Sequence, residues 1–189
     1  MSLNVEILNG TLVVRFIRPE SRNPLSIEVL TQLHNFIDSI DDDASKLIFT
    51  GSGDAFASGA NLTEIAKVNA DTAREFALLG QTLMNKIAAL SMPTITAVNG
   101  YCFGGALDLA LSCKKRIASP NAVFAHPGVG LGIITGWGGT QRLPRLIGEA
   151  AALEMLLTAD RFTVNWALRT GLIDAINDDP LDYAIKYLN

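Results

Sequence analysis

Three glycine-rich segments of the sequence, residues 51–59, 100–105 and 128–139, could place backbone N–H groups against a negatively charged oxygen. Many such loops bind nucleotides, but neither G-x-G-x-x-G nor G-x-x-x-x-G-K-[ST] occurs here at any register. The nucleophile motif G-x-S-x-G of serine hydrolases is missing as well. The sequence therefore predicts neither a nucleotide loop nor a serine nucleophile.

The middle segment has the makings of an oxyanion site. An uncharged, β-branched strand is expected over 94–98, and Gly104 and Gly105 then open an apolar helix that runs to about Ser112. The first turn of a helix has free N–H groups and is electropositive, and glycine lets an oxygen approach the backbone closely. The small-residue loop 56–60 could add a second donor to a thioester oxyanion. Alternatively, these glycines only permit close packing of a helix on a strand.

The strands and helices expected around these loops alternate along the chain, which indicates an α/β fold with parallel pairing as the default. Asn9-Gly10 predicts a hairpin turn, Ser26 an N-cap, and Pro93 the end of the second helix. No strand signal is found beyond about residue 140. We expect strands over 5–8, 11–16, 46–50, 94–98, 116–118 and 122–125, and helices over 26–40, 71–90, 105–112, 141–147, 150–157, 164–170 and 181–188.

Composition excludes several classes of function. The chain has 189 residues, 49 % hydrophobic and 18 % charged, with a net charge of −4, so it can form a core and is not expected to bind nucleic acid. The basic run 114–116 is expected only to mark a helix end. Neither a signal peptide nor a membrane span is expected, which suggests a soluble, cytoplasmic protein. A disulfide between Cys102 and Cys113 is not expected, and two histidines, His34 and His126, are too few for a metal site.

Four segments, in this order along the chain, resemble the enoyl-CoA hydratase/isomerase (crotonase) superfamily. Residues 19–25 (PESRNPL) are similar to its early coenzyme A-contacting loop, and 55–62 (AFASGANL) to its first oxyanion motif. Residues 97–110 (AVNGYCFGGALDLA) resemble the second oxyanion motif, and 131–143 a third family stretch. The resemblance covers nearly the whole chain.

The resemblance implies a fold and a ligand. The fold would be α/β, a crotonase-like (ClpP/crotonase) spiral of ββα units over 1–140, with a short C-terminal helical region over 141–189. The ligand would be an acyl-coenzyme A thioester in a bent pose, as substrate, with no metal or organic cofactor. Ala60 and Gly105 would donate the two oxyanion N–H groups, and the assembly would be a homotrimer or a dimer of trimers. The resemblance also implies the following substrate-binding residues: Asn23, Leu25, Ala57, Ser58, Gly59, Asn61, Leu62, Gly104, Gly128 and Trp137.

The sequence departs from the family at the two glutamates that hold and deprotonate water in its hydratases. The first falls on Asp108, three residues after Gly105 and on the same helix face, where the carboxylate is kept but is one methylene shorter. The second falls on Gly128, which has no side chain. His126, two residues earlier, either replaces it as acid or base or is a structural, hydrogen-bonded histidine. Trp137, where many relatives have a small residue, either narrows the acyl pocket or only packs.

One carboxylate is enough to move a proton between two carbons without activating water. We therefore favour an isomerase-type, enolate-forming acyl-CoA enzyme with Asp108 as acid and base. A weak enoyl-CoA hydratase (a lyase) is the first alternative, and a non-catalytic acyl-CoA-binding or assembly subunit is the second. An ion-pair partner in the interior remains the alternative role for Asp108.

Overall fold

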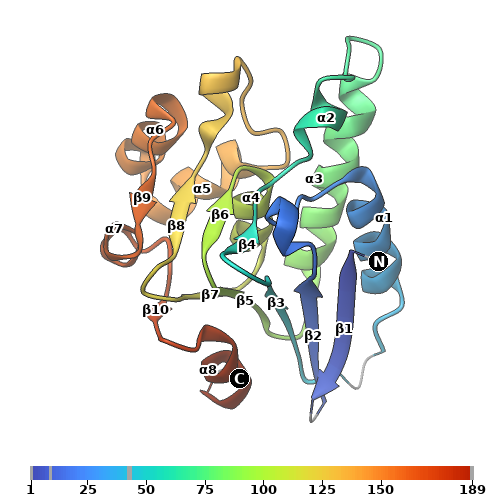
Figure 1. Cartoon of the computed structure of the whole chain (residues 1–189), viewed down its shortest axis with the longest axis vertical. Helices are drawn as coiled ribbons and strands as arrows, with labels where there is room; N and C mark the ends of the chain where they lie inside the picture. Colours follow the sequence, from blue (N-terminus) through green and yellow to red (C-terminus); the bar gives the residue numbers. More distant parts are fainter. Residues whose placement is uncertain (1, 9, 42–43, 188–189) are drawn as a thin grey trace.

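A computed structural model describes residues 2–8, 10–41 and 44–187, and within them two β-sheets and eight α-helices (Figure 1). The strands of the larger sheet, in spatial order, are β1 (Leu3–Leu8), β2 (Thr11–Phe16), β3 (Lys46–Thr50), β5 (Thr94–Val98), β7 (Lys115–Ala118) and β10 (Ala175–Ile176). Those of the smaller sheet are β4 (Ala55–Ala57), β6 (Tyr101–Phe103), β8 (Val123–Ala125) and β9 (Phe162–Thr163).

Apart from α2, the α-helices begin and end close to the predicted residues. Ser26 caps the first one as expected, since its hydroxyl accepts a 3.3 Å hydrogen bond from the Val29 N–H. The α-helices are α1 (Ile27–Asp38), α2 (Leu62–Ile65), α3 (Ala73–Ala89), α4 (Gly105–Ser112), α5 (Gly139–Ile147), α6 (Glu149–Thr158), α7 (Val164–Thr170) and α8 (Pro180–Tyr187), and two 3-10 helices are η1 (Pro19–Ser21) and η2 (Pro127–Leu131).

Both sheets are mixed. β1 pairs with β2 antiparallel and β9 with β8 antiparallel, whereas the other pairs are parallel. The expected default of parallel pairing therefore holds apart from the hairpin, which was predicted as such, and from β9, which was not predicted. The hairpin between β1 and β2 is confirmed, although Asn9 of its predicted turn lies outside the described residues. The chain passes from β3 to β4, from β5 to β6 and from β7 to β8, each time followed by helical structure. The expected repeat of two strands and a helix is therefore present.

The two faces of the larger sheet are covered by different helices. Leu47 and Phe49 of β3 belong to the main core cluster with residues of α1 and α3, whereas Ile48 belongs to a second cluster with Ala184 of α8. Alternate residues of a strand point to opposite faces, so a strand covered on both faces has no side that faces solvent. This is why β3 and β5 are buried at every position.

Several short elements were not predicted. β4 and β6 lie in segments that we interpreted as glycine-rich loops, α2 was not expected, and the prediction that no strand follows residue 140 is wrong because β9 and β10 lie there. β9 and β10 have two residues each and are defined by pairing with β8 and β7. Such strands are stabilised by their partners and leave almost no local pattern. The division into 1–140 and 141–189 stays a prediction; in space, the second segment adds a strand to each sheet.

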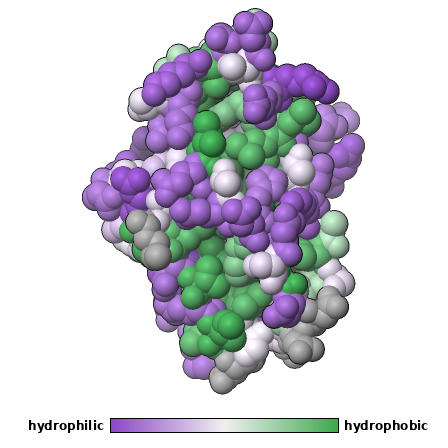
Figure 2. Space-filling model, turned by 90° about the vertical axis from the view of Figure 1, so that its right-hand side faces the viewer, coloured by the Kyte–Doolittle hydropathy of each residue, from purple (hydrophilic) through white to green (hydrophobic). Residues whose placement is uncertain are grey.

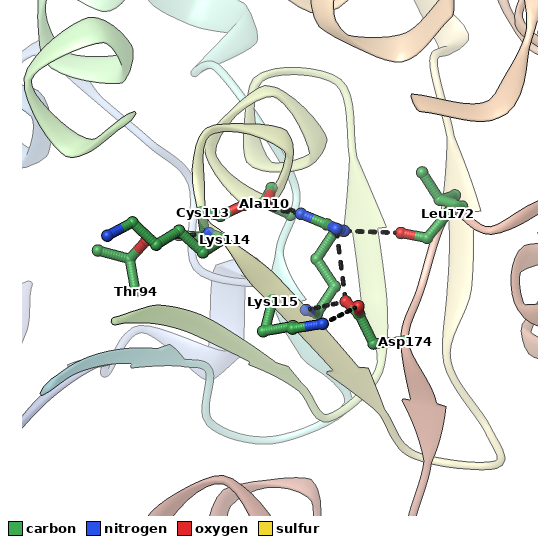
Figure 3. Close-up of polar contacts among 8 residues, drawn as sticks. Thr94, Ala110, Cys113, Lys114, Lys115, Leu172 and Asp174 are labelled. Atoms are coloured by element: carbon green, nitrogen blue, oxygen red, sulfur yellow. Dashed lines mark hydrogen bonds and ion pairs between the residues drawn. The ribbon is translucent and has the colours of Figure 1, made fainter. Parts of the chain in front are cut away.

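The basic run 114–116 does not simply mark the end of a helix, because Lys115 and Arg116 belong to β7. Figure 3 shows the Lys115 side chain pointing toward Asp174. The Arg116 side chain is 7 % exposed and donates to the carbonyls of Leu172 (2.8 Å) and Cys113 (2.7 Å). Asp174 accepts hydrogen bonds from the Arg116 N–H (2.8 Å) and from the Lys115 ammonium (3.0 Å). These bonds attach the segment before β10 to β7.

The surface and the thiols complete the description of the fold. β1 is an edge strand that exposes Val5, Ile7 and Leu8, and Figure 2 shows apolar surface on the lower part of this side of the molecule. Cys102 and Cys113 are buried free thiols, and burial raises the pKa of both, that of Cys113 to about 12. Across the described residues, every helix is too short or too polar to cross a membrane.

Candidate active site

The two predicted oxyanion loops meet because β4 and β6 are parallel neighbours, so that their carboxyl ends lie side by side. Gly59, directly before Ala60, has a φ of +89°, and a Cβ there would lie 2.5 Å from the Phe103 carbonyl oxygen and 3.0 Å from the Gly105 nitrogen. A side chain at Gly59 would therefore push the loops apart. The Leu25 N–H holds the first loop by a 2.8 Å hydrogen bond to the Gly59 carbonyl.

The second loop is fixed to the neighbouring strand. The Gly104 N–H donates to the carbonyl of Ala125 at the end of β8 (2.9 Å), and Gly104 has a φ of +53° that favours glycine. α4 then begins at Gly105, whose N–H belongs to the free first turn of the helix. Ala60 and Gly105 line one cavity. This arrangement is able to bring two N–H donors to one oxygen atom.

Asp108 lies one turn further along α4 and lines the same cavity. It is 1 % exposed, and the Thr135 hydroxyl donates a hydrogen bond to its Oδ2. Burial raises the pKa of Asp108 to about 7, against the opposing effects of the Thr135 hydroxyl, the backbone N–H groups of Trp137 and Gly139, and the charge of Arg142. A carboxylic acid with a pKa near 7 is able both to accept and to return a proton at neutral pH.

His126 directly follows β8 and faces Asp108. Its Nε2 lies 3.6 Å from Asp108 Oδ1, which is too long for a hydrogen bond, and burial lowers the pKa of the imidazole to about 4. In the described part of the chain, neither ring nitrogen nor Asp108 Oδ1 has a hydrogen-bond partner. A Cβ at Gly139 would lie 2.2 Å from Asp108 Oδ1 and 3.1 Å from His126 Nε2, so only glycine leaves room beside the pair.

The cavity has a volume of about 260 Å³ and is mostly apolar. Helices α2 and α3 form one wall, the segment 131–137 forms another, and the buried indole of Trp137 closes it next to Gly105. Trp137 thus both packs in the interior and borders the cavity. Among the described residues, no three His, Cys, Asp or Glu side chains gather where they could hold a metal ion.

The predicted site residues fall into two groups. The structure brings eight of them to the cavity wall: Ser58, Ala60, Leu62, Gly104, Gly105, Asp108, Gly128 and Trp137. The other five lie nearby but do not line it: Asn23, Leu25, Ala57, Gly59 and Asn61.

Residues of the second group make contacts that stabilise the protein itself. The Asn23 amide donates to the carbonyls of Ser52, Ala55 and Phe56, with its oxygen accepting from the Arg18 N–H. Leu25 and Ala57 are core residues. The Asn61 side chain caps α2 by accepting from the N–H groups of Thr63 and Glu64. Direct contacts of these five residues with coenzyme A stay a prediction.

Two neighbours of Asp108, Thr135 and Gly139, were not predicted as site residues. Gly139 stands in the third family-like stretch, but only the fold shows that it faces the carboxylate. Gly128 is at the cavity wall in η2, where a Cβ would lie 2.9 Å from the Ile133 carbonyl oxygen. A larger side chain at this position would require η2 to shift.

Comparison with known proteins shows the family of this chain. Residues 6–188 match the family model described as enoyl-CoA hydratase/isomerase. A crotonyl-CoA hydratase of Syntrophomonas wolfei is 43 % identical over 162 residues, which cover 84 % of this chain and 62 % of that protein. A short-chain-enoyl-CoA hydratase of Clostridium acetobutylicum is 40 % identical over 182 residues, which cover 93 % and 70 %. The chain thus spans about two thirds of the length of these relatives.

Solved structures show the same fold. An enoyl-CoA hydratase from Bacillus anthracis superposes with a TM-score of 0.93 at 32 % identity, covering 98 % of this chain and 74 % of that one. A putative enoyl-CoA hydratase from Rhodopseudomonas palustris superposes with a TM-score of 0.94 at 29 % identity, covering 98 % and 72 %. The two mixed sheets therefore form the crotonase fold, and the chain belongs to the enoyl-CoA hydratase/isomerase (crotonase) family.

Proposed function

We propose that this chain binds an acyl-CoA thioester, holds its carbonyl oxygen between the N–H groups of Ala60 and Gly105, and moves a proton with Asp108. In the isomerase-type reaction that we favour, Asp108 removes a proton from C2 of a 3-enoyl thioester. The electron pair moves toward the thioester oxygen, where the two N–H groups stabilise the enolate. Asp108 then returns the proton to C4, which leaves the double bond between C2 and C3.

The position of Asp108 carries this proposal. A carboxyl group that is 1 % exposed lies one helical turn from Gly105 and opens onto the same cavity. An isolated buried carboxylate is costly, so a purely structural Asp108 would be expected to have a cationic partner within hydrogen-bond distance. Among the described residues, the ion-pair contact of Asp108 is with His126, whose lowered pKa keeps the imidazole neutral at pH 7. This favours proton transfer over an interior ion pair.

Hydration of a 2-enoyl thioester is the second candidate function. It is supported by His126, which lies 3.6 Å from Asp108 and could help to hold a water molecule, and by the names of the two hydratase relatives. Gly128 argues against the version that uses two carboxylates, because it has no side chain.

The test is an assay of the purified chain with 3-enoyl-CoA and 2-enoyl-CoA thioesters, beside Asp108→Asn. We expect double-bond migration in the wild type and a loss of about 10²- to 10⁴-fold in the variant, since one general acid–base contributes roughly this factor. Asp160→Asn, at an exposed site, is the matched control and should keep full activity.

Each other result selects a different function. Hydration that is faster than migration and sensitive to Asp108→Asn would favour the hydratase. Acyl-CoA binding without turnover of any thioester would favour the non-catalytic subunit. Equal activity of Asp108→Asn and wild type would refute the role of Asp108.

The assembly and the location are also proposed on family membership. We propose a homotrimer or a dimer of trimers, to be checked by light scattering coupled to size exclusion, and a cytoplasmic location. No metal or organic cofactor enters the proposed reaction, because the oxyanion N–H groups and one carboxyl group supply its chemistry.

A further inference from the structure

The indole of Trp137 occupies a slot between two helices. A Cβ added to Gly80 of α3 would lie 2.3 Å from Trp137 Cδ1, and one added to Gly105 of α4 would lie 2.3 Å from Trp137 Cζ3. The ring is therefore in contact with both helix backbones, and each contact requires a glycine. Trp137 is 3 % exposed, so nearly all of its surface is packed against the protein.

Further contacts hold the ring in place. Phe76, one turn before Gly80 on α3, packs on the indole with 5.7 Å between ring centroids. The Gln81 amide donates a 2.8 Å hydrogen bond to the carbonyl of Gly136, which joins the segment before the ring to α3. Phe76 packs on the ring, and the hydrogen bond to Gly136 holds the backbone just before it, so Trp137 forms a rigid wall of the cavity.

This wall stands next to the proposed oxyanion site. Trp137, Gly105 and Asp108 line one cavity of about 260 Å³, which is below the range of about 300–1,000 Å³ for pockets that enclose drug-sized ligands. Because the indole touches the Gly105 backbone, an acyl chain whose carbonyl is held at Gly105 meets the ring after a few carbons. The gap between α3 and α4, where a longer chain could continue, is filled by the ring.

We propose that Trp137, seated between Gly80 and Gly105, sets the acyl-chain length of this site and limits it to short-chain thioesters. The inference rests on the proposed binding of acyl-CoA at Gly105. Gly80 is a positioning residue, because it acts by leaving room for the ring. The competing path for a long chain leads over Leu131 and Ile134, which are exposed at the rim of the cavity.

Binding of saturated acyl-CoA tests the inference without requiring turnover. Butanoyl-CoA and octanoyl-CoA are titrated by calorimetry into wild type and Trp137→Leu. We expect the wild type to prefer butanoyl-CoA by at least about tenfold, since a filled apolar pocket rejects added methylenes. Trp137→Leu should reduce this preference at least about tenfold. Trp166→Leu, at a tryptophan that does not line the cavity, should leave it unchanged.

A second variant keeps the test valid if loss of the indole prevents folding. Gly80→Ala adds a methyl group against the ring, so it should weaken binding of butanoyl-CoA, and Gly80→Ala combined with Trp137→Phe should recover part of the loss. Circular dichroism checks that each variant is folded.

The failing outcomes are distinct. A wild type that binds both thioesters equally, or a folded Trp137→Leu with unchanged preference, refutes the chain-length role and indicates the path over Leu131 and Ile134. A Gly80→Ala variant that binds butanoyl-CoA like the wild type refutes the role of Gly80. A folded wild type that binds no acyl-CoA refutes the proposed function and this inference together.

Discussion

His126 Nε2 lies 3.6 Å from Asp108 Oδ1, and the two buried side chains have pKa values displaced in opposite directions. Burial disfavours the charged form of each group, so it raises the pKa of the acid and lowers that of the base. The folded protein therefore keeps both groups neutral over a range in which the unfolded chain ionises them.

The pair predicts compensating effects of pH on stability. Asp108 has a folded pKa of about 7 against 3.8, so the folded state binds the extra proton between these values, and stability falls as pH rises. His126 has a folded pKa of about 4 against 6.5, so the unfolded state binds the extra proton, and stability rises with pH. From about pH 4 to 6.5 the two contributions oppose each other.

Single substitutions should expose each contribution. In Asp108→Asn only the contribution of His126 remains. The free energy of unfolding of this variant minus that of the wild type should therefore rise with pH, by up to about 1.4 kcal/mol per pH unit. In His126→Gln only the contribution of Asp108 remains, so the free energy of unfolding of this variant minus that of the wild type should fall as pH rises. Urea unfolding at pH 4.5, 5.5 and 6.5 measures both slopes. Parallel curves for all three proteins would contradict the pKa values.

Activity should follow the ionisation of Asp108. Removal of a proton from C2 requires the carboxylate, so kcat/KM for double-bond migration should rise with pH through an apparent pKa of about 7. A profile over pH 5 to 9 checks this. A midpoint close to 4 would mean that the carboxyl group is solvated in the free enzyme.

Gly105→Ala should impair both stability and activity. The added Cβ would lie 2.3 Å from the Trp137 ring, and forcing a methyl group into such a packed site typically costs about 1–3 kcal/mol. The shifted backbone would also misplace the oxyanion N–H. Gly130→Ala is the control, because the nearest atom to its Cβ is at 3.8 Å, and thermal unfolding with activity assays compares the two. Equal behaviour of both variants would argue against contact between Gly105 and the indole.

Asp174→Asn should destabilise the attachment of β10 to β7. The buried Arg116 guanidinium would lose its carboxylate partner, at a cost on the order of 3 kcal/mol, because an unpaired buried charge remains. Asp38→Asn, which breaks the exposed pair with Lys86, should cost at most about 1 kcal/mol. Chemical unfolding of the two variants provides the comparison, and similar losses would mean that Arg116 finds water or another acceptor.

Local pattern was enough to predict the elements that are long and buried. Lys46–Thr50, Thr94–Val98 and Val164–Thr170 were located by their apolar or helical periodicity, and Ser26 by its capping chemistry. β9 and β10 were not predicted, because a strand of two residues is too short to show a periodic pattern. They are strands only because they pair with β8 and β7. α2 was not predicted, because a helix of a single turn that directly follows a glycine-rich loop cannot be told from the loop by its sequence pattern.

Residue types and spacing alone were enough to predict the order of the longer strands and helices, the two glycine loops, the short carboxylate at 108 and the missing side chain at 128. These follow from residue types and from spacing along the chain. The tertiary structure alone decided that Gly59 lies against Gly105, that Gly139 and Thr135 face Asp108, and that Trp137 fills a slot between two glycines. Each of these contacts joins segments that are distant in sequence. The contact between Gly59 and Gly105 depends on the parallel pairing of β4 and β6, and the others depend on how the segment 135–139 packs against α3 and α4. Spacing along one segment contains no information about that distance.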